Sequence, residues 1–266
     1  MKTKRILNLI VVAFVAMTLL ITWNLFPSIP PVIAQQQTSL TVSAAISLSQ
    51  ALQELKTVYQ TRNPNVTITY NFGASGALAQ QIQQGAPVDV FFSAATKQMN
   101  DLQQSNLLIN DTRRNLLTNR LVLITPKNGL ALSDVKQLTD ARIKKIALGE
   151  PKSVPVGQYA REMLTKLGLW QQLQSKLVLG NNVRQVLTFV ESGNVDAGIV
   201  YTTDAKASDK VTLRLTAAEN LHSPIVYPLA VIRNSRNPAA AKAFVDFLAG
   251  DRAKIVFQKY GFGMVR

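Results

Sequence analysis

The sequence contains no cysteine and only one histidine, His222. The lack of cysteine excludes disulfides, thiolate metal sites, cysteine nucleophiles and a lipid-modified cysteine anchor. One histidine cannot form a multi-histidine metal site and argues against a Ser-His-Asp triad. We expect His222, in a Leu-His-Ser-Pro loop, at the surface. Acidic residues are also scarce, with 15 Asp and Glu against 29 Lys and Arg. The net charge of +14 is compatible with three kinds of partner, namely nucleic acid, anionic lipid or a small anion.

The N-terminus has the composition of an export signal. Three basic residues within the first five precede an apolar run from Ile6 to Phe26, and small residues follow up to Ala34. This order predicts a signal peptide over residues 1–34, and the length of the apolar run leaves an uncleaved membrane anchor as the alternative. Either outcome places the rest of the chain in the periplasm, because the basic cluster stays cytoplasmic. Without residues 1–34 the net charge is +11, from 26 Lys and Arg against 15 Asp and Glu.

The rest of the chain alternates strand and helix patterns, and 47% hydrophobic residues are enough for a core. The predicted strands are Leu40–Ala44, Val66–Phe72, Val88–Ser93, Arg120–Pro126, Lys145–Leu148, Ala197–Tyr201 and Tyr227–Ile232. The predicted helices are Leu48–Tyr59, Gly76–Gln84, Lys97–Gln104, Leu132–Leu138, Gly157–Leu167, Val183–Glu191, Pro238–Leu248 and Arg252–Tyr260. Repeated β-α-β units predict an α/β fold with a parallel-rich sheet and helices on both faces.

Two strand patterns, Leu121–Pro126 and Pro224–Val231, lie at similar distances from the two ends of the chain. This spacing suits a chain that leaves one lobe, builds a second and returns. We therefore expect residues 38–120 and 228–266 to form lobe 1 and residues 121–227 to form lobe 2. The two strand segments would cross between the lobes as a hinge.

Several segments combine a strand end with residues that begin helices. They are Ser43–Ser49, Phe72–Leu78, Gly149–Tyr159, Asn181–Arg184 and Asp196–Tyr201. Each one alone is better explained as a helix cap, a tight turn or a packed tyrosine. Together they suggest an anion held by free N–H groups at helix N-termini, beyond the carboxyl ends of the strands. The basic residues form no stripe with aromatic residues, so we expect no nucleic-acid partner.

The order of these segments resembles the molybdate-binding proteins of bacterial molybdenum ABC importers, over about residues 40–263. The segments that carry the resemblance are Ala44–Leu48, Gly85–Phe91, Val154–Ala160, Gly198–Tyr201 and Tyr260–Phe262. The resemblance implies the two-lobe type II periplasmic binding protein fold, in which each lobe is a sheet flanked by helices. It implies a monomer that captures molybdate and tungstate and delivers them to an inner-membrane ABC permease and its ATPase. No catalysis and no cofactor are implied.

In that family two serines with their amides, two further backbone amides and one tyrosine hydroxyl bind the oxyanion. The matching residues here are Ser47, Ser75, Val156, Val183 and Tyr201. Molybdenum would be bound only as molybdate, through these residues. Many relatives have a run of serines at the second position, where this chain has Ala74-Ser75-Gly76, so neighbouring hydroxyls are lost. Arg184 could approach the ligand or point to solvent.

Two alternatives remain open. The same fold could bind another oxyanion such as sulfate. An exported hydrolase is less favoured, because the chain offers no metal cluster, no cysteine nucleophile and no credible histidine base.

Overall fold

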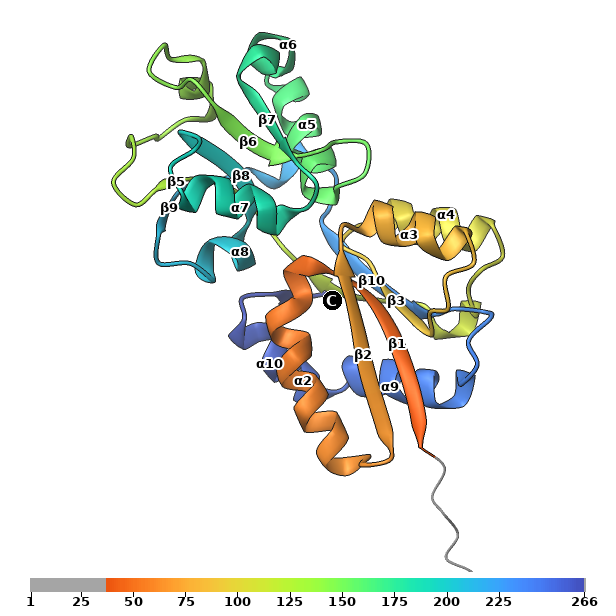
Figure 1. Ribbon diagram of the computed structural model, residues 1–266. Coiled ribbons are helices and arrows are strands. Elements are labelled where there is room, and N and C mark those ends of the chain that lie inside the picture. Colours follow the sequence, from red (N-terminus) through yellow and green to blue (C-terminus); the bar gives the residue numbers. More distant parts are fainter. Residues whose placement is uncertain (1–36, 266) are drawn as a thin grey trace, which may run out of the picture. The chain divides into compact units, whose positions relative to one another are not determined.

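The computed structural model describes residues 37–265, so the predicted signal peptide or anchor over residues 1–34 lies outside the described residues. The described chain forms two β-sheets, each flanked by helices (Figure 1). None of the helices within residues 37–265 has the length and apolar character needed to cross a membrane.

The first sheet has six strands in the order β11-β4-β10-β3-β1-β2. Its strands are β1 (Thr38–Ala45), β2 (Val66–Gly73), β3 (Val90–Phe92), β4 (Arg114–Thr118), β10 (Val226–Val231) and β11 (Gly263–Met264). The helices that belong with it are η1 (Ile46–Leu48), α2 (Ser49–Arg62), α3 (Ser75–Gln83), α4 (Thr96–Gln104), η2 (Asn110–Thr112), α9 (Pro238–Ala249) and α10 (Asp251–Lys259). In Figure 1, α2 runs along β2, which it contacts.

The second sheet has five strands in the order β7-β6-β8-β5-β9. Its strands are β5 (Leu121–Pro126), β6 (Ile146–Gly149), β7 (Leu177–Gly180), β8 (Ala197–Tyr201) and β9 (Val211–Thr216). The helices between and after these strands are η3 (Val135–Thr139), α5 (Pro155–Lys166), α6 (Trp170–Leu173), η4 (Gln174–Lys176), α7 (Val183–Glu191), α8 (Thr202–Lys206) and η5 (Glu219–Leu221).

The predicted α/β class, with helix-flanked sheets, is confirmed, but the sheets are mixed rather than mainly parallel. The strands joined through helices pair in parallel, namely β1 with β2 and β3, and β6 with β7 and β8. Strand β5 pairs antiparallel with β8 and β9, and β4 pairs antiparallel with β10 and β11. The strands that run against the parallel set are β5 in the second sheet and β10 and β11 in the first. Strands β5 and β10 are those through which the chain enters a sheet from the other one, where no crossover helix within the sheet imposes a parallel direction.

The lobe boundaries stay a prediction. The observation that bears on them is which strands pair in each sheet. Strand β5 pairs only within the second sheet, and β10 pairs only within the first. The chain therefore passes between the sheets at Asn119–Arg120 and again over residues 217–225.

Aromatic rings fix the C-terminal end of the chain to the first sheet. Phe257 of α10 meets Phe92 edge to face at 6.1 Å between ring centroids and meets Phe262 at 5.9 Å. Phe262 in turn meets Tyr227 of β10 at 5.4 Å. All four residues are buried, and edge-to-face pairs of this kind add roughly 0.5–1.5 kcal/mol each beyond their burial. The ring of Tyr227 is thus held in place by packing.

The N-terminal turn of α5 lies against the end of β6 with no room for a side chain between them. A Cβ added at Gly157 would lie 1.9 Å from the carbonyl oxygen of Gly149. At the other end of α5, Gly168 has a φ of +72° and open space around it, so a side chain there would strain only its own backbone.

This difference gives a prediction for two glycine variants. Gly157→Ala should lower the free energy of unfolding by about 3 kcal/mol or more, because backbone must move. Gly168→Ala should cost only about 1–2 kcal/mol, the penalty for a left-handed non-glycine residue. Urea denaturation followed by circular dichroism measures both. Equal costs would mean that the approach of α5 to β6 relaxes freely.

Candidate anion-binding site

One cavity lies where helix starts meet the carboxyl ends of strands from both sheets. Its empty volume is about 220 Å³, part of it open solvent. All five residues matched to the family's ligands line this cavity. The full lining is Ala45, Ile46, Ser47, Gly73, Ala74, Ser75, Ala94, Val154, Pro155, Val156, Val183 and Tyr201. The structure therefore brings the five candidates together, while their role in binding stays a prediction.

Strand direction explains why these residues converge. Strands β1 and β2 pair in parallel, and so do β6 and β7, so each pair ends at one edge of its sheet. A helix begins directly or shortly after each of the four strands: η1 leading into α2, then α3, α5 and α7. Helix starts at the carboxyl edge of a sheet are the usual place for a ligand in open α/β sheets.

The helix starts give the cavity a positive electrostatic character. Each contributes about half an elementary charge, so four contribute about two. No acidic residue lies in the first turn of η1, α3, α5 or α7 among the described helices. No carboxylate or carboxamide side chain is among the described residues that line the cavity. Neither the described lining residues nor the first turns of these helices therefore offset the partial charges.

The two serines each have one hydrogen bond from the protein. Ser75 is fully buried, and its Oγ accepts a bond from the backbone N–H of Ala94 at 2.9 Å. The Oγ of Ser47 lies 3.1 Å from the hydroxyl of Tyr227. A serine hydroxyl that accepts a bond keeps its proton to donate elsewhere.

Val156 and Val183 offer their backbone rather than their side chains. Val156 follows Pro155, the first residue of α5, and Val183 is the first residue of α7. The N–H groups in a first helical turn have no partner within the helix. Pro155 has no backbone N–H, so Val156 is the first residue of α5 that can donate one. At α7 the side chain of Asn182 caps the N–H of Gln185, and within residues 37–265 no group accepts a hydrogen bond from the N–H of Val183.

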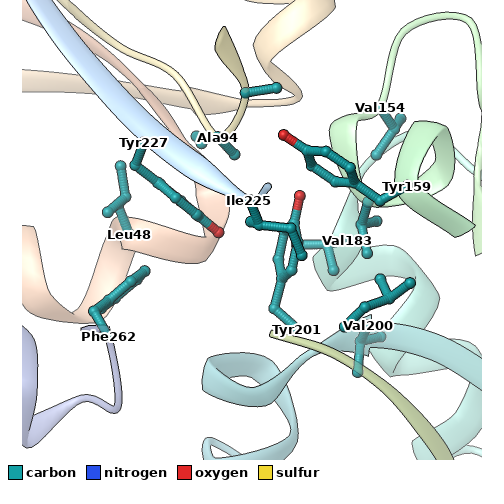
Figure 2. Packing of buried hydrophobic residues seen from close by; sticks show 14 of the residues in the cluster. Leu48, Ala94, Val154, Tyr159, Val183, Val200, Tyr201, Ile225, Tyr227 and Phe262 are labelled. Atoms are coloured by element: carbon teal, nitrogen blue, oxygen red, sulfur yellow. The ribbon is translucent and has the colours of Figure 1, made fainter. Parts of the chain in front are cut away.

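Tyr201 is the last residue of β8, and its side chain is buried. No group within residues 37–265 hydrogen-bonds this hydroxyl. Figure 2 shows it pointing away from the strand, toward the region between Ala94 and Val154. Burial, with a smaller contribution from Tyr227, raises the pKa of Tyr201 well above its usual value. The hydroxyl is therefore neutral and can donate a hydrogen bond to a ligand in the cavity.

The elements that line the cavity touch across it. The N–H of Gly76, in the first turn of α3, donates to the carbonyl of Ser153, just before α5, at 3.0 Å. A Cβ at Gly76 would lie 2.3 Å from the same oxygen. Gly76 thus permits the two helix starts to approach each other at the cavity rim.

Asp204 lies behind Tyr201 and outside the cavity lining. It is buried, and its carboxylate accepts a bond from the backbone N–H of Tyr201 at 3.3 Å. Burial raises the pKa of Asp204 to about 7, and the positive charge of Arg184 offsets part of this rise. Arg184 itself does not line the cavity. Its charge acts on Asp204, a relationship that the sequence did not suggest.

The expectation for His222 was wrong. Its side chain is buried, packs edge to face on Tyr159 at 5.9 Å, and places Nδ1 2.8 Å from the carbonyl of Ser223. The α5 helix, which carries Tyr159, covers the loop and removes the histidine from solvent. Within residues 37–265 no group of three or more histidine or acidic side chains could hold a metal ion.

Comparison with known proteins places this architecture in a family. Residues 40–263 match the model for bacterial extracellular solute-binding proteins, and the chain belongs to that family. A provisionally assigned ABC transporter substrate-binding lipoprotein of Bacillus subtilis, YvgL, is 45% identical over 86% of this chain and 88% of its own. The molybdate-binding protein ModA of Haemophilus influenzae is 37% identical over 84% of this chain and 89% of its own.

A solved structure agrees with these relatives. The periplasmic molybdate-binding protein of Azotobacter vinelandii superposes with a TM-score of 0.78 at 26% identity, covering 85% of this chain and 100% of its own.

The unpaired hydroxyl of Tyr201 leads to a prediction about stability without ligand. Tyr201→Phe should leave the free energy of unfolding unchanged or raise it by up to about 1 kcal/mol, because a buried unpaired polar atom is removed. Tyr227→Phe should lower it by about 1–3 kcal/mol, because its hydroxyl has partners. Urea denaturation measures both variants. A loss for Tyr201→Phe as large as for Tyr227→Phe would show that the Tyr201 hydroxyl has a partner.

Asp204 leads to a prediction about pH. An unfolded aspartate has a pKa of about 3.9, so between about pH 4 and pH 7 the folded protein holds a proton that the unfolded chain has lost. Asp204 should therefore make stability fall as pH rises through this window, by at most about 1.4 kcal/mol per pH unit. Asp204→Asn should flatten that slope and be more stable than wild type at pH 8. Urea denaturation from pH 4 to pH 8 tests this, with the exposed Asp209→Asn as control. An unchanged slope in Asp204→Asn would contradict the prediction.

Proposed function

We propose that this protein binds molybdate, and also tungstate, in the cavity and delivers the oxyanion to an inner-membrane ABC permease with its ATPase. It acts in the periplasm as a monomer, catalyses no reaction and uses no cofactor. The observation that carries the proposal is the donor set: Ser47, Ser75, Val156, Val183 and Tyr201 line one cavity. Relatives that are 37% and 38% identical are named molybdate-binding proteins.

The charge and donor pattern suit a fully deprotonated dianion. Four helix starts supply about two positive charges, which match the charge of molybdate without Lys or Arg. Hydroxyl and backbone N–H groups can donate to every oxygen of such an ion. A buried anion without enough donors would be strongly disfavoured, so the number of donors in the lining supports an oxyanion with four oxygens.

The same pattern disfavours phosphate. Near neutral pH phosphate still carries a proton, and that proton needs an acceptor in the cavity. Among the described lining residues only hydroxyl lone pairs are available as side-chain acceptors, since no carboxylate lies there. Leaving the proton poorly paired costs roughly 1–3 kcal/mol.

Sulfate must be distinguished by size, because it is also a deprotonated tetrahedral dianion. Donors placed for the longer bonds of molybdate lie too far from the oxygens of sulfate to make short hydrogen bonds. We therefore assign the preference for molybdate over sulfate to the spacing of the donors rather than to their chemistry.

Calorimetric titration of residues 35–266 with four anions tests the proposal. We expect molybdate and tungstate to bind with similar affinity, sulfate to bind well below them, and phosphate to give no detectable heat at neutral pH. Tight sulfate binding with weak molybdate binding would show that the site binds an oxyanion but that molybdate is not its preferred ligand. Binding of phosphate at comparable concentration would show that an acceptor is present and that the ligand set is wrong.

Ser47→Ala and Ser49→Ala form a matched pair for the same titration. Ser47 lines the cavity, whereas Ser49, two residues on, does not. A hydrogen bond to a charged ligand contributes about 1.5–3 kcal/mol, so Ser47→Ala should weaken molybdate binding at least roughly tenfold. Ser49→Ala should bind as wild type. Equal affinity of the two variants would remove Ser47 from the ligand set.

A further inference from the structure

We propose that Asn119 and Tyr227, which lie outside the cavity lining, hold the Ser47 hydroxyl as a hydrogen-bond donor to the bound oxyanion. The three side chains form a directed chain of hydrogen bonds, here called the Asn119–Tyr227–Ser47 relay. The inference rests on the proposed function, because it concerns how the same site selects a deprotonated anion.

The direction of the relay begins at the amide of Asn119. The backbone N–H of Arg120 lies 2.9 Å from Asn119 Oδ1, and a backbone N–H can only donate. This contact identifies which atom of the amide is oxygen and which is nitrogen. The nitrogen, Nδ2, then donates its two protons, one to Thr203 Oγ1 at 3.0 Å and one to the hydroxyl of Tyr227 at 3.2 Å.

The next hydrogen bond in the relay joins Tyr227 to Ser47. The Tyr227 hydroxyl accepts a bond from Asn119, and its oxygen lies 3.1 Å from the Oγ of Ser47, a contact in which either hydroxyl can be the donor. The relay assigns the proton of this contact to Tyr227. Burial raises the pKa of Tyr227, which keeps the hydroxyl protonated. Its ring is fixed between Phe262 and Tyr201, at 5.4 Å and 5.9 Å. Figure 2 shows Tyr227 beside Leu48, the residue that follows Ser47.

Ser47 is the end of the relay and the only one of its three members that lines the cavity. Because Ser47 Oγ accepts from Tyr227, its single proton is free to point into the cavity. Each bond in such a chain polarises the next, so Ser47 becomes a better donor to an anion than an isolated serine. Tyr227 and Asn119 are therefore positioning residues, which act on the ligand through Ser47.

The relay also joins the two sheets. Ser47 follows β1 and Tyr227 lies in β10, both of the first sheet, while Thr203 lies in α8 after β8 of the second. Asn119 sits where the chain passes from β4 to β5. A variant of Tyr227 could thus change binding through Ser47 or through the packing between the sheets, and the test must separate these two routes.

A double-mutant cycle with molybdate separates them. Tyr227→Phe should weaken binding roughly three- to tenfold in the wild-type background, the size of one neutral hydrogen bond. In the Ser47→Ala background the same change should alter the affinity by less than about twofold, because the group it acts through is gone. The control is Tyr70→Phe, which also loses one buried hydroxyl bond, to Leu52 O, away from the cavity.

The outcomes of this cycle are distinct. A loss that persists unchanged in the Ser47→Ala background would assign Tyr227 to packing between the sheets and overturn the relay. Wild-type affinity in Tyr227→Phe would overturn it as well. If the wild-type protein binds none of molybdate, tungstate and sulfate, the proposed function itself fails. If the wild-type protein binds molybdate but the effects of Tyr227→Phe and Ser47→Ala on affinity add, the relay alone fails. Circular dichroism and urea unfolding establish that each variant is folded.

Asn119→Asp tests the direction. A carboxylate at this position still accepts from the N–H of Arg120 but cannot donate, so the proton of Tyr227 would turn toward it and Ser47 would donate to Tyr227. Ser47 would then have no proton for the anion, and we expect at least tenfold weaker molybdate binding.

The added charge of the aspartate is controlled by repeating Asn119→Asp in the Tyr227→Phe background, where no reversal can reach Ser47. There the loss should be at least roughly threefold smaller. The same loss in both backgrounds would mean that charge alone acts on the anion, which contradicts a directed relay.

Discussion

The free N–H groups at the helix starts are the constraint on which the rest of the site depends. The starts of η1, α3, α5 and α7 border one cavity, and none of these described helices has an acidic residue in its first turn. Like partial charges facing one another repel, and the protein supplies no carboxylate among the described lining residues to offset them. An anion between them satisfies donors from both sheets at once. In the proposed complex, binding would therefore be coupled to the arrangement of the two sheets, and ligand would stabilise the folded state that presents all the donors.

The fold could be predicted from the sequence where the local pattern was strong. Strand β1 alternates polar residues with Leu40, Val42 and Ala44, and β8 is a short apolar run that ends in a tyrosine. Helix α7 has apolar side chains at regular helical spacing. The missed strands β4, β7, β9 and β11 are short or half-exposed and lie at or near sheet edges. In β9, by contrast, Val211, Leu213 and Leu215 alternate with polar residues, and the polar Arg214 bonds through its guanidinium to Thr125 and Gly129. The two-residue strand β11 is specified by its neighbours rather than by its own residues.

The candidate site divides in the same way. Ser47, Ser75 and Val183 each lie two or three residues after a strand end, and Val156 lies seven residues after one, so their clustering follows from strand direction. The burial of His222 and Asp204 depends on helices packed over them, which no local pattern reveals. Asp204 offered one signal, its position three residues after Tyr201, the spacing of a helix cap. Asn119 and Tyr227 lie 108 residues apart and are ordinary residue types, so only the folded structure brings them together.

In the proposed site, selection of the anion would follow from where the hydroxyl protons point, which groups outside the cavity would decide. Ser75 accepts a bond from the N–H of Ala94, and in the proposed relay Ser47 accepts one from Tyr227, which would turn both serine protons inward. Tyr201 is kept neutral by burial, and its hydroxyl is left without a partner among the described residues. All three hydroxyls therefore enter the cavity as donors. A fully deprotonated oxyanion matches this pattern, and a protonated one meets donors where it needs an acceptor. In the proposed site, the helix starts would set the charge of the ligand, and the hydrogen bonds behind the serines would set its protonation state.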